Sequence, residues 1–116
     1  MTFKNNNPQR DARYERIYQE AEQAARKAAE LFRSKHGEPP IVGFAWVKIR
    51  GGCSFALWLK RAHPDVGRKG HHNGWDIWCP GGLQTQSMEI LRIAATAFAR
   101  TMALYAIQAD VYSRED

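Results

Sequence analysis

Aromatic and cationic side chains alternate with small or apolar ones between residues 41 and 61, in the stretch IVGFAWVKIRGGCSFALWLKR. Aromatic rings stack on nucleic-acid bases, and neighbouring lysine and arginine side chains contact phosphates. Proteins that bind single strands with little sequence preference combine these two groups on one surface. The stretch therefore predicts a binding surface if its rings and cations share an exposed face.

We interpret this stretch as a β-hairpin, because two runs rich in β-branched and aromatic residues flank Gly51-Gly52. One face is apolar throughout and must contact a core; it comprises Ile41, Gly43, Ala45, Val47, Ile49, Cys53, Phe55, Leu57 and Leu59. The other face comprises Phe44, Trp46, Lys48, Arg50, Ser54, Ala56, Trp58 and Lys60. A two-residue loop would mix these sets, so the pattern predicts an odd loop, for example residues 50–52 with a G1 bulge.

A second candidate site is the long loop over residues 62–73, AHPDVGRKGHHN. Its glycines and positive charges fit a loop that contacts phosphates, although a solvated connection would have the same composition. Its histidines would strengthen such binding below about pH 6.5. The residues concerned are Arg61, His63, Arg68, Lys69, His71 and His72.

Metal binding and catalysis find little support in the residue spacing. The metal-ligating types His63, His71, His72, Asp76 and Cys79 include no close pair such as Cys-x-x-Cys or His-x-x-x-His. Cys79 with a loop histidine lacks a third group at a recognisable spacing, and the sequence has no nucleophile elbow or phosphate-binding glycine loop before a helix. We expect no metal, no cofactor, no catalytic residue and hence no enzyme.

Composition places the chain among small basic globular proteins. Its 116 residues are 44% hydrophobic and 25% charged, which predicts one domain over residues 8–116 after a flexible N-terminus at residues 1–7. The net charge of +5 favours polyanionic partners, nucleic acid first. Two cysteines make no disulfide framework, and no stretch resembles a signal peptide or a membrane span, so we expect a cytoplasmic protein that does not bind membranes.

The remaining elements follow from periodicity and capping signals. Asn7-Pro8 predicts the start of a helix that continues to about Lys35 and ends at Gly37. This helix is longer than a small sheet needs, so its first turns, with Tyr14 and Tyr18, are expected to overhang the domain as a dimer or partner contact.

A third strand is predicted over residues 74–79, with Asp76 and Trp78 on one face and Trp75, Ile77 and Cys79 on the other. A buried helix should begin near Thr85 or Ser87, and residues 108–113 are expected to form a short edge strand. The predicted fold class is α+β: an antiparallel sheet of three or four strands with two helices, in the order α-β-β-β-α(-β).

The helix-strand order resembles the double-stranded RNA-binding domain, and Leu91 to Leu104, LRIAATAFARTMAL, is similar to the second helix of that family in its alanine-rich rhythm. That family opens its second helix with a lysine cluster, whereas residues 83–88, LQTQSM, contain no cation. We therefore transfer no functional residues from it.

Two functions of different classes remain open. The first is non-enzymatic nucleic-acid binding, with single-stranded DNA or RNA favoured, through Phe44, Trp46, Lys48, Arg50, Trp58, Lys60, Arg61, Arg68, Lys69, His71 and Trp78. The second is a small phage- or plasmid-type interaction or inhibitor protein that docks on a larger protein complex as a dimer. In that case the same aromatic face, or Tyr14 and Tyr18, would bind the partner. The sequence also leaves open whether the first helix covers the aromatic face.

Overall fold

A computed structural model describes residues 7–116 of the protein. This range contains three α-helices and a four-stranded antiparallel sheet, which confirms the predicted α+β class. In chain order the elements are α1 (Pro8–His36), β1 (Gly43–Arg50), α2 (Ser54–Ala62), β2 (Gly67–Lys69), the 3₁₀ turn η1 (His71–Asn73), β3 (Gly74–Trp78), α3 (Met88–Leu104) and β4 (Asp110–Glu115).

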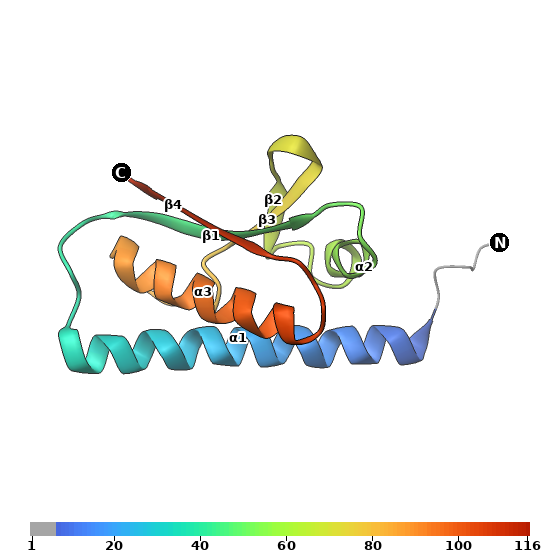
Figure 1. The fold of residues 1–116 in the computed structure, drawn as a ribbon, viewed down its shortest axis with the longest axis horizontal. Coiled ribbons are helices and arrows are strands. Elements are labelled where there is room, and N and C mark those ends of the chain that lie inside the picture. Colours follow the sequence, from blue (N-terminus) through green and yellow to red (C-terminus); the bar gives the residue numbers. More distant parts are fainter. Residues whose placement is uncertain (1–6) are drawn as a thin grey trace.

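The sheet has helices on one side only (Figure 1). Its strand order is β2-β3-β1-β4, so β1 is an inner strand and β4 is an edge. Helix α3 lies against the sheet, and α1 runs along the far side of α3. The turn between β2 and β3 projects from the opposite side of the sheet. Within the described residues, no helix covers that opposite side, which answers the question that the sequence left open.

Helix α1 forms where its capping residues and apolar stripe predict it. The Asn7 side chain accepts a hydrogen bond from the Arg10 amide at 3.0 Å, and Pro8 occupies the first helical position. Gly37, with a φ of 69°, ends the helix. The residues that α1 buries are Ile17, Tyr18, Ala21, Ala25 and Ala29. Residues 1–6 of the expected flexible N-terminus lie outside the described residues.

Strand β1 shows the predicted alternation. Gly43, Ala45, Val47 and Ile49 are buried against the helices, while the side chains between them point to the other side. Strand β3 pairs with β1 so that Val47 lies opposite Ile77 and Trp46 lies opposite Trp78. Its two faces are therefore also those that the sequence predicts.

The prediction of a second hairpin strand is wrong, because residues 54–62 form helix α2. Gly51 and Gly52 lie in a tight turn, in which the Cys53 amide donates to the Arg50 carbonyl at 3.2 Å. The predicted odd loop with a G1 bulge is therefore wrong as well. In these nine residues Phe55, Leu57 and Leu59 have the period of a strand, whereas the residues that are buried, Phe55, Ala56, Trp58 and Leu59, have the spacing of one helix face. The helix also breaks the order expected for a double-stranded RNA-binding domain.

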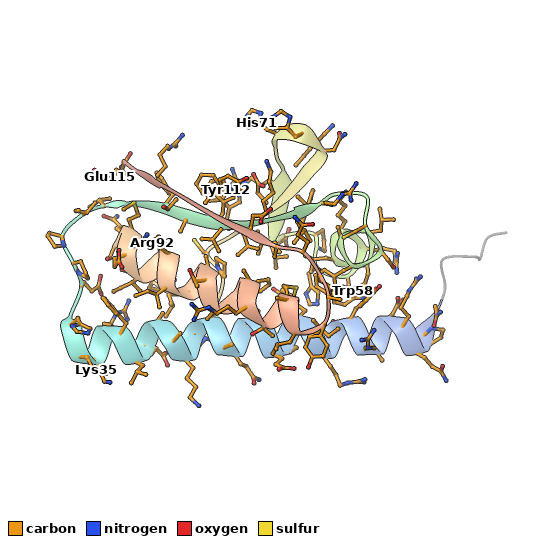
Figure 2. The ribbon with its side chains drawn as sticks, viewed as in Figure 1. Lys35, Trp58, His71, Arg92, Tyr112 and Glu115 are labelled. Atoms are coloured by element: carbon orange, nitrogen blue, oxygen red, sulfur yellow. The ribbon has the colours of Figure 1, made fainter. Side chains whose placement is uncertain are left out.

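Trp58, predicted on the aromatic sheet face, is only 3% exposed in the core. Its side chain extends from α2 toward the first half of α1 (Figure 2). Its ring centroid is 5.9 Å from that of Tyr14 and 6.4 Å from that of Tyr18. Trp58 is therefore a packing residue and cannot stack on a base while the domain is folded.

The predicted overhang of Tyr14 and Tyr18 is also wrong, because the unforeseen helix α2 covers them. Tyr18 is 5% exposed. The Tyr14 ring lies edge-to-face with Phe55 at 5.3 Å, and its hydroxyl donates to Ser54 Oγ at 2.9 Å. These two tyrosines bind α2 of the same chain, so they do not form a free docking surface.

The C-terminal elements follow the sequence closely. The Ser87 hydroxyl accepts from the Ile90 amide at 3.4 Å and caps α3, with Glu89 in the first turn. Ile90, Leu91, Ala94, Ala95, Phe98 and Met102 of α3 are buried. Strand β4 pairs antiparallel with β1 at the edge of the sheet, as expected for residues 108–113, although it begins two residues later.

Trp58→Ala should lower the free energy of unfolding by about 3–5 kcal/mol, because it removes a large aromatic side chain from a packed core. Trp46→Ala, on the exposed side of the sheet, should cost about 1 kcal/mol, since it loses only cross-strand contacts. Urea denaturation followed by circular dichroism measures both values. Equal losses for the two variants would contradict this placement of Trp58.

Candidate functional site

Three aromatic rings stand side by side across the uncovered side of the sheet. Trp46 of β1 lies opposite Trp78 of β3 and Tyr112 of β4 in the strand register. The Trp46 ring stacks on Trp78 at 4.6 Å between centroids and on Tyr112 at 6.0 Å. Figure 2 shows Tyr112 on the side of the sheet away from the helices. We refer to Trp78, Trp46 and Tyr112 as the aromatic ladder.

A second pair borders the aromatic ladder toward the start of β1. Phe44 lies opposite Arg114 in the register. The Phe44 ring meets Trp78 edge-to-face at 6.4 Å, and the Arg114 guanidinium lies 5.7 Å from the Phe44 centroid. This is the geometry of a weak cation-π contact at an exposed site. Arg114 is thus held over an aromatic surface while its hydrogen-bond donors stay available.

A row of charged residues borders the aromatic ladder on its other side. Arg68, Asp76, Lys48 and Asp110 lie opposite one another across β2, β3, β1 and β4. The Lys48 ammonium is 5.4 Å from the Tyr112 centroid. Together with Arg50, the next outward residue of β1, these residues complete what we call the outer face: Phe44, Trp46, Lys48, Arg50, Arg68, Asp76, Trp78, Asp110, Tyr112 and Arg114.

The cations of the outer face lie near two acids but form no close ion pair with them: Lys48 is opposite Asp76 and Asp110 in the register, and Arg68 is opposite Asp76. Within residues 7–116, Lys48, Arg50, Arg68 and Arg114 form no ion pair with a carboxylate. Some arginines on the helical side, such as Arg92 with Glu89 at 2.8 Å, do form such an ion pair. A cation whose charge is not neutralised within the protein can bind an external anion without first losing an ion pair. With Lys48, Arg50, Arg68 and Arg114 against Asp76 and Asp110, the outer face therefore carries an excess of positive charge around an aromatic centre.

The outermost rings of this face are the most accessible. Tyr112 is 45% exposed and Phe44 is 39% exposed. Trp46 and Trp78 are half-buried because each is stacked on a neighbour. A base can stack on Tyr112 or Phe44, or lie across the edges of the two tryptophans, and each such contact would remove apolar area from water.

Asp76 is a buried acid within this basic row. It is 9% exposed, and its Oδ1 atom accepts no hydrogen bond from the described residues. A side chain at Gly70 would collide with this carboxyl, so glycine is needed where the β2–β3 turn crosses it. Burial raises the pKa of Asp76 above its ordinary value of 3.8, and the positive charges of Lys48 and His71 offset part of that rise.

Several predicted site residues lie elsewhere in the fold. The Lys60 ammonium donates to the Gly51 carbonyl at 2.7 Å and lies 5.1 Å from the Trp75 centroid, so it stabilises the turn after β1. Arg61 pairs with Asp11 of α1 at 3.3 Å. Lys69 lies opposite Trp75 in the register and therefore shares the face opposite to Asp76. None of the three belongs to the outer face.

His71 lies at the tip of the β2–β3 turn, beyond the outer face (Figure 2). The predicted loop over residues 62–73 is thus mostly the end of α2, a short strand and this turn. Of its cations, only Arg68 lies in the charged row. His72 contributes to a shallow hollow that also involves Lys48, Arg50 and Tyr112, so the tip of the turn borders the outer face.

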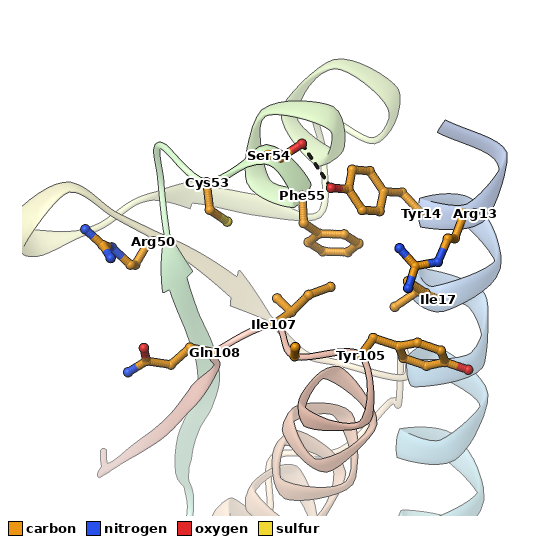
Figure 3. A pocket seen from close by; sticks show the side chains of 11 residues that line it. Arg13, Tyr14, Ile17, Arg50, Cys53, Ser54, Phe55, Tyr105, Ile107 and Gln108 are labelled. Atoms are coloured by element: carbon orange, nitrogen blue, oxygen red, sulfur yellow. Dashed lines mark hydrogen bonds between the residues drawn. The ribbon is translucent and has the colours of Figure 1, made fainter. Parts of the chain in front are cut away.

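A separate hollow of about 360 Å³ lies where α1, the start of α2 and the end of α3 meet (Figure 3). Phe55 and Ile107 project into it, and Arg13 approaches from α1. Arg50 borders this hollow as well as the outer face. Cys53 beside it and Cys79 are both free thiols. Within residues 7–116, no cluster of three metal-ligating side chains could hold a metal ion.

Tyr112 and Arg114 are the two functional candidates that sequence reasoning missed. The sequence predicted a strand here but assigned it no binding role. The alternation Asp110, Tyr112, Arg114 does place a ring between two charges on one face of that strand. This alternation does not predict the pairing of β4 with β1, which brings Tyr112 beside Trp46 and Arg114 beside Phe44.

No protein-family model, curated protein or solved structure matches this chain. In the part of the chain that the structure describes, no helix is both long and apolar enough to cross a membrane. The outer face must therefore be interpreted from its own chemistry.

Asp76→Asn should stabilise the protein at neutral pH, because the folded state then no longer buries an ionised carboxylate. The raised pKa means that the folded protein holds the Asp76 proton more tightly than the unfolded chain does. The wild-type protein accordingly loses stability as pH rises from about 3.8 through the raised pKa, and this loss persists above it. Thermal unfolding of both proteins from pH 3 to pH 8 checks this. A constant difference in melting temperature across that range would contradict it.

Proposed function

We propose that this protein is a small, non-enzymatic nucleic-acid-binding protein that acts in the cytoplasm and favours single strands. One observation carries the proposal: the aromatic ladder lies uncovered at the centre of a sheet face whose four cations have no ion-pair partners among the described residues. The formal net charge of +5 supports the same partner class.

The outer face offers the two contacts that a single strand needs. Tyr112, Phe44 and the edges of Trp46 and Trp78 would receive bases, while Lys48, Arg50, Arg68 and Arg114 would contact the backbone phosphates. Bases in a duplex are already stacked and paired, so their faces are not available to protein rings. The aromatic centre of this face therefore favours DNA or RNA whose bases are unpaired.

The first experiment is a tryptophan-fluorescence titration with a short single-stranded oligonucleotide at low and at moderate salt. Trp46 and Trp78 on the outer face should report binding by saturable quenching, whereas Trp58 is shielded in the core. The quenching should weaken as salt rises, because phosphate contacts release counterions. Unchanged fluorescence at both salt concentrations would contradict the proposal.

Tyr112→Ala should weaken oligonucleotide binding by about 1–3 kcal/mol, the typical contribution of one ring stacked on a base. The change removes an exposed side chain, so the fold should tolerate it. Leu104→Ala is a matched control, since Leu104 is 76% exposed at the end of α3. Affinities from the same titration provide the measurement. Equal affinities for Tyr112→Ala and Leu104→Ala would show that Tyr112 does not stack on a base.

Arg114→Ala should reduce the slope of log affinity against log salt by about 0.7, the value for one phosphate contact on a single strand. Arg92→Ala is the control of equal charge, because Arg92 lies on α3 and pairs with Glu89. Titrations at four or more salt concentrations give both slopes. A slope for Arg114→Ala equal to that of wild type would remove Arg114 from the phosphate-binding set.

The alternative function is docking on a larger protein complex, as a phage- or plasmid-type interaction or inhibitor protein. The rings of the aromatic ladder already stack on one another, so their exposed edges form an apolar surface that also suits a protein partner. Salt separates the two proposals. Binding through apolar edges should change little with salt, whereas binding to phosphates should weaken steeply.

A further inference from the structure

Strand β4 leaves one full row of backbone groups without strand partners. Among residues 7–116 it is the last strand of the sheet and pairs only with β1. The Asp116 amide donates to the Val42 carbonyl at 2.9 Å, and antiparallel pairs alternate between hydrogen-bonded and non-hydrogen-bonded. The amides and carbonyls of Asp110, Tyr112 and Arg114 therefore point toward β1. Those of Val111, Ser113 and Glu115 point away from the sheet, where another strand could pair with them.

The charges on this edge are self-complementary. On the outer face, Asp110 and Arg114 flank Tyr112 at equal distances along the strand. If a second β4 pairs antiparallel about a two-fold axis at Tyr112, Asp110 of each copy lies opposite Arg114 of the other. Opposite charges at directly facing positions stabilise such a pair. We propose that β4 is a docking edge for a second copy of this chain, with the two-fold axis at Tyr112.

The neighbouring registers lack this match. A two-fold axis at Val111 places Arg114 opposite Gln108, and an axis at Ser113 places Asp110 opposite Asp116, which are like charges. Registers that pair odd-numbered with even-numbered residues would mix the two faces of the sheet. Charged side chains on edge strands usually prevent pairing with other proteins. Here the charges favour pairing with an identical edge in one register, since the two neighbouring registers gain no attractive pair on this face.

The surface beside the edge suits a second copy. A hollow of about 570 Å³ lies between α3 and β4, lined by Ile93, Ala97 and Val111 together with the charged residues Glu89, Arg92 and Arg100. Pairing of the two β4 strands would join the sheets into one eight-stranded sheet and place the two Tyr112 residues opposite each other. The aromatic ladders of both copies would then form one continuous row. The dimer stands on the geometry of β4 alone and does not require that the outer face binds nucleic acid.

The test exchanges the two charges in separate variants and measures molar mass by sedimentation velocity over a range of concentrations without nucleic acid. Wild type should dimerise. Asp110→Arg places two arginine pairs at the interface, and Arg114→Asp places two aspartate pairs there. Each change should raise the dissociation constant on the order of tenfold or more, since two attractive pairs become repulsive. An equimolar mixture of the two variants restores both attractive pairs and should form a heterodimer with near wild-type affinity.

A backbone pair of variants tests the edge without changing any charge. Ser113→Pro removes an amide that points away from β1, so the sheet within one chain is kept while the contact between copies is lost. Ser113→Ala keeps this amide and should dimerise like wild type. Circular dichroism identifies any variant that fails to fold. If a charge variant fails to fold, the comparison of Ser113→Pro with Ser113→Ala decides whether β4 is the dimer interface.

Three results would overturn the proposal. The first is a wild-type protein that stays monomeric at every concentration. The second is dimerisation of both charge variants and Ser113→Pro at wild-type affinity, which would place the interface elsewhere, for instance on the aromatic ladder. The third is a mixture of the two folded charge variants that stays monomeric.

Discussion

The alternation of side chains along β1 is the constraint on which the rest of the structure depends. As an inner strand, β1 hydrogen-bonds to β3 on one side and β4 on the other, so its register fixes the register of both. Val47 and Ile49 are fully buried against the helices, so a slip of one residue would turn them to water and is strongly disfavoured. The same constraint holds Trp46 and Lys48 on the opposite side. The core and the outer face are thus two consequences of one pattern.

The two sides of the molecule handle charge differently. On the helical side, some arginines form ion pairs with acids of the same or a neighbouring helix, as Arg61 does with Asp11. On the outer face, Lys48 and Arg114 lie near rings and form no ion pair among the described residues. Contact with a ring orients a cation without neutralising it. Asp76 differs from these cations because it is a buried acid. Its raised pKa reflects the cost of holding a carboxylate away from water.

The placement of Tyr112 links the aromatic ladder to the free edge of the sheet. Its ring completes the ladder, while its strand carries the unpaired backbone row and the opposed charges of Asp110 and Arg114. A second copy paired at β4 would therefore extend the outer face and leave it uncovered. The two proposals are compatible in space because one uses the face of the sheet and the other uses its edge.

The sequence by itself determined the elements whose signals are local. Asn7-Pro8 and Ser87 start α1 and α3 where their capping chemistry predicts, and the period of two along β1 separates Val47 from Trp46. Phe44, Trp46, Lys48, Arg50 and Trp78 therefore lie on one face, as the alternation indicates.

Only the tertiary structure decided the second half of the predicted hairpin and the partners of β4. The apolar residues of 54–62 fit the period of a strand and also that of a helix. In the folded protein this segment is helix α2, and Trp58 is buried against Tyr14 and Tyr18 of α1. Tyr112 joins the aromatic ladder through pairing with a strand more than sixty residues earlier in the chain. Such pairing depends on the whole core, because a strand acquires neighbours only when the chain between them has folded back.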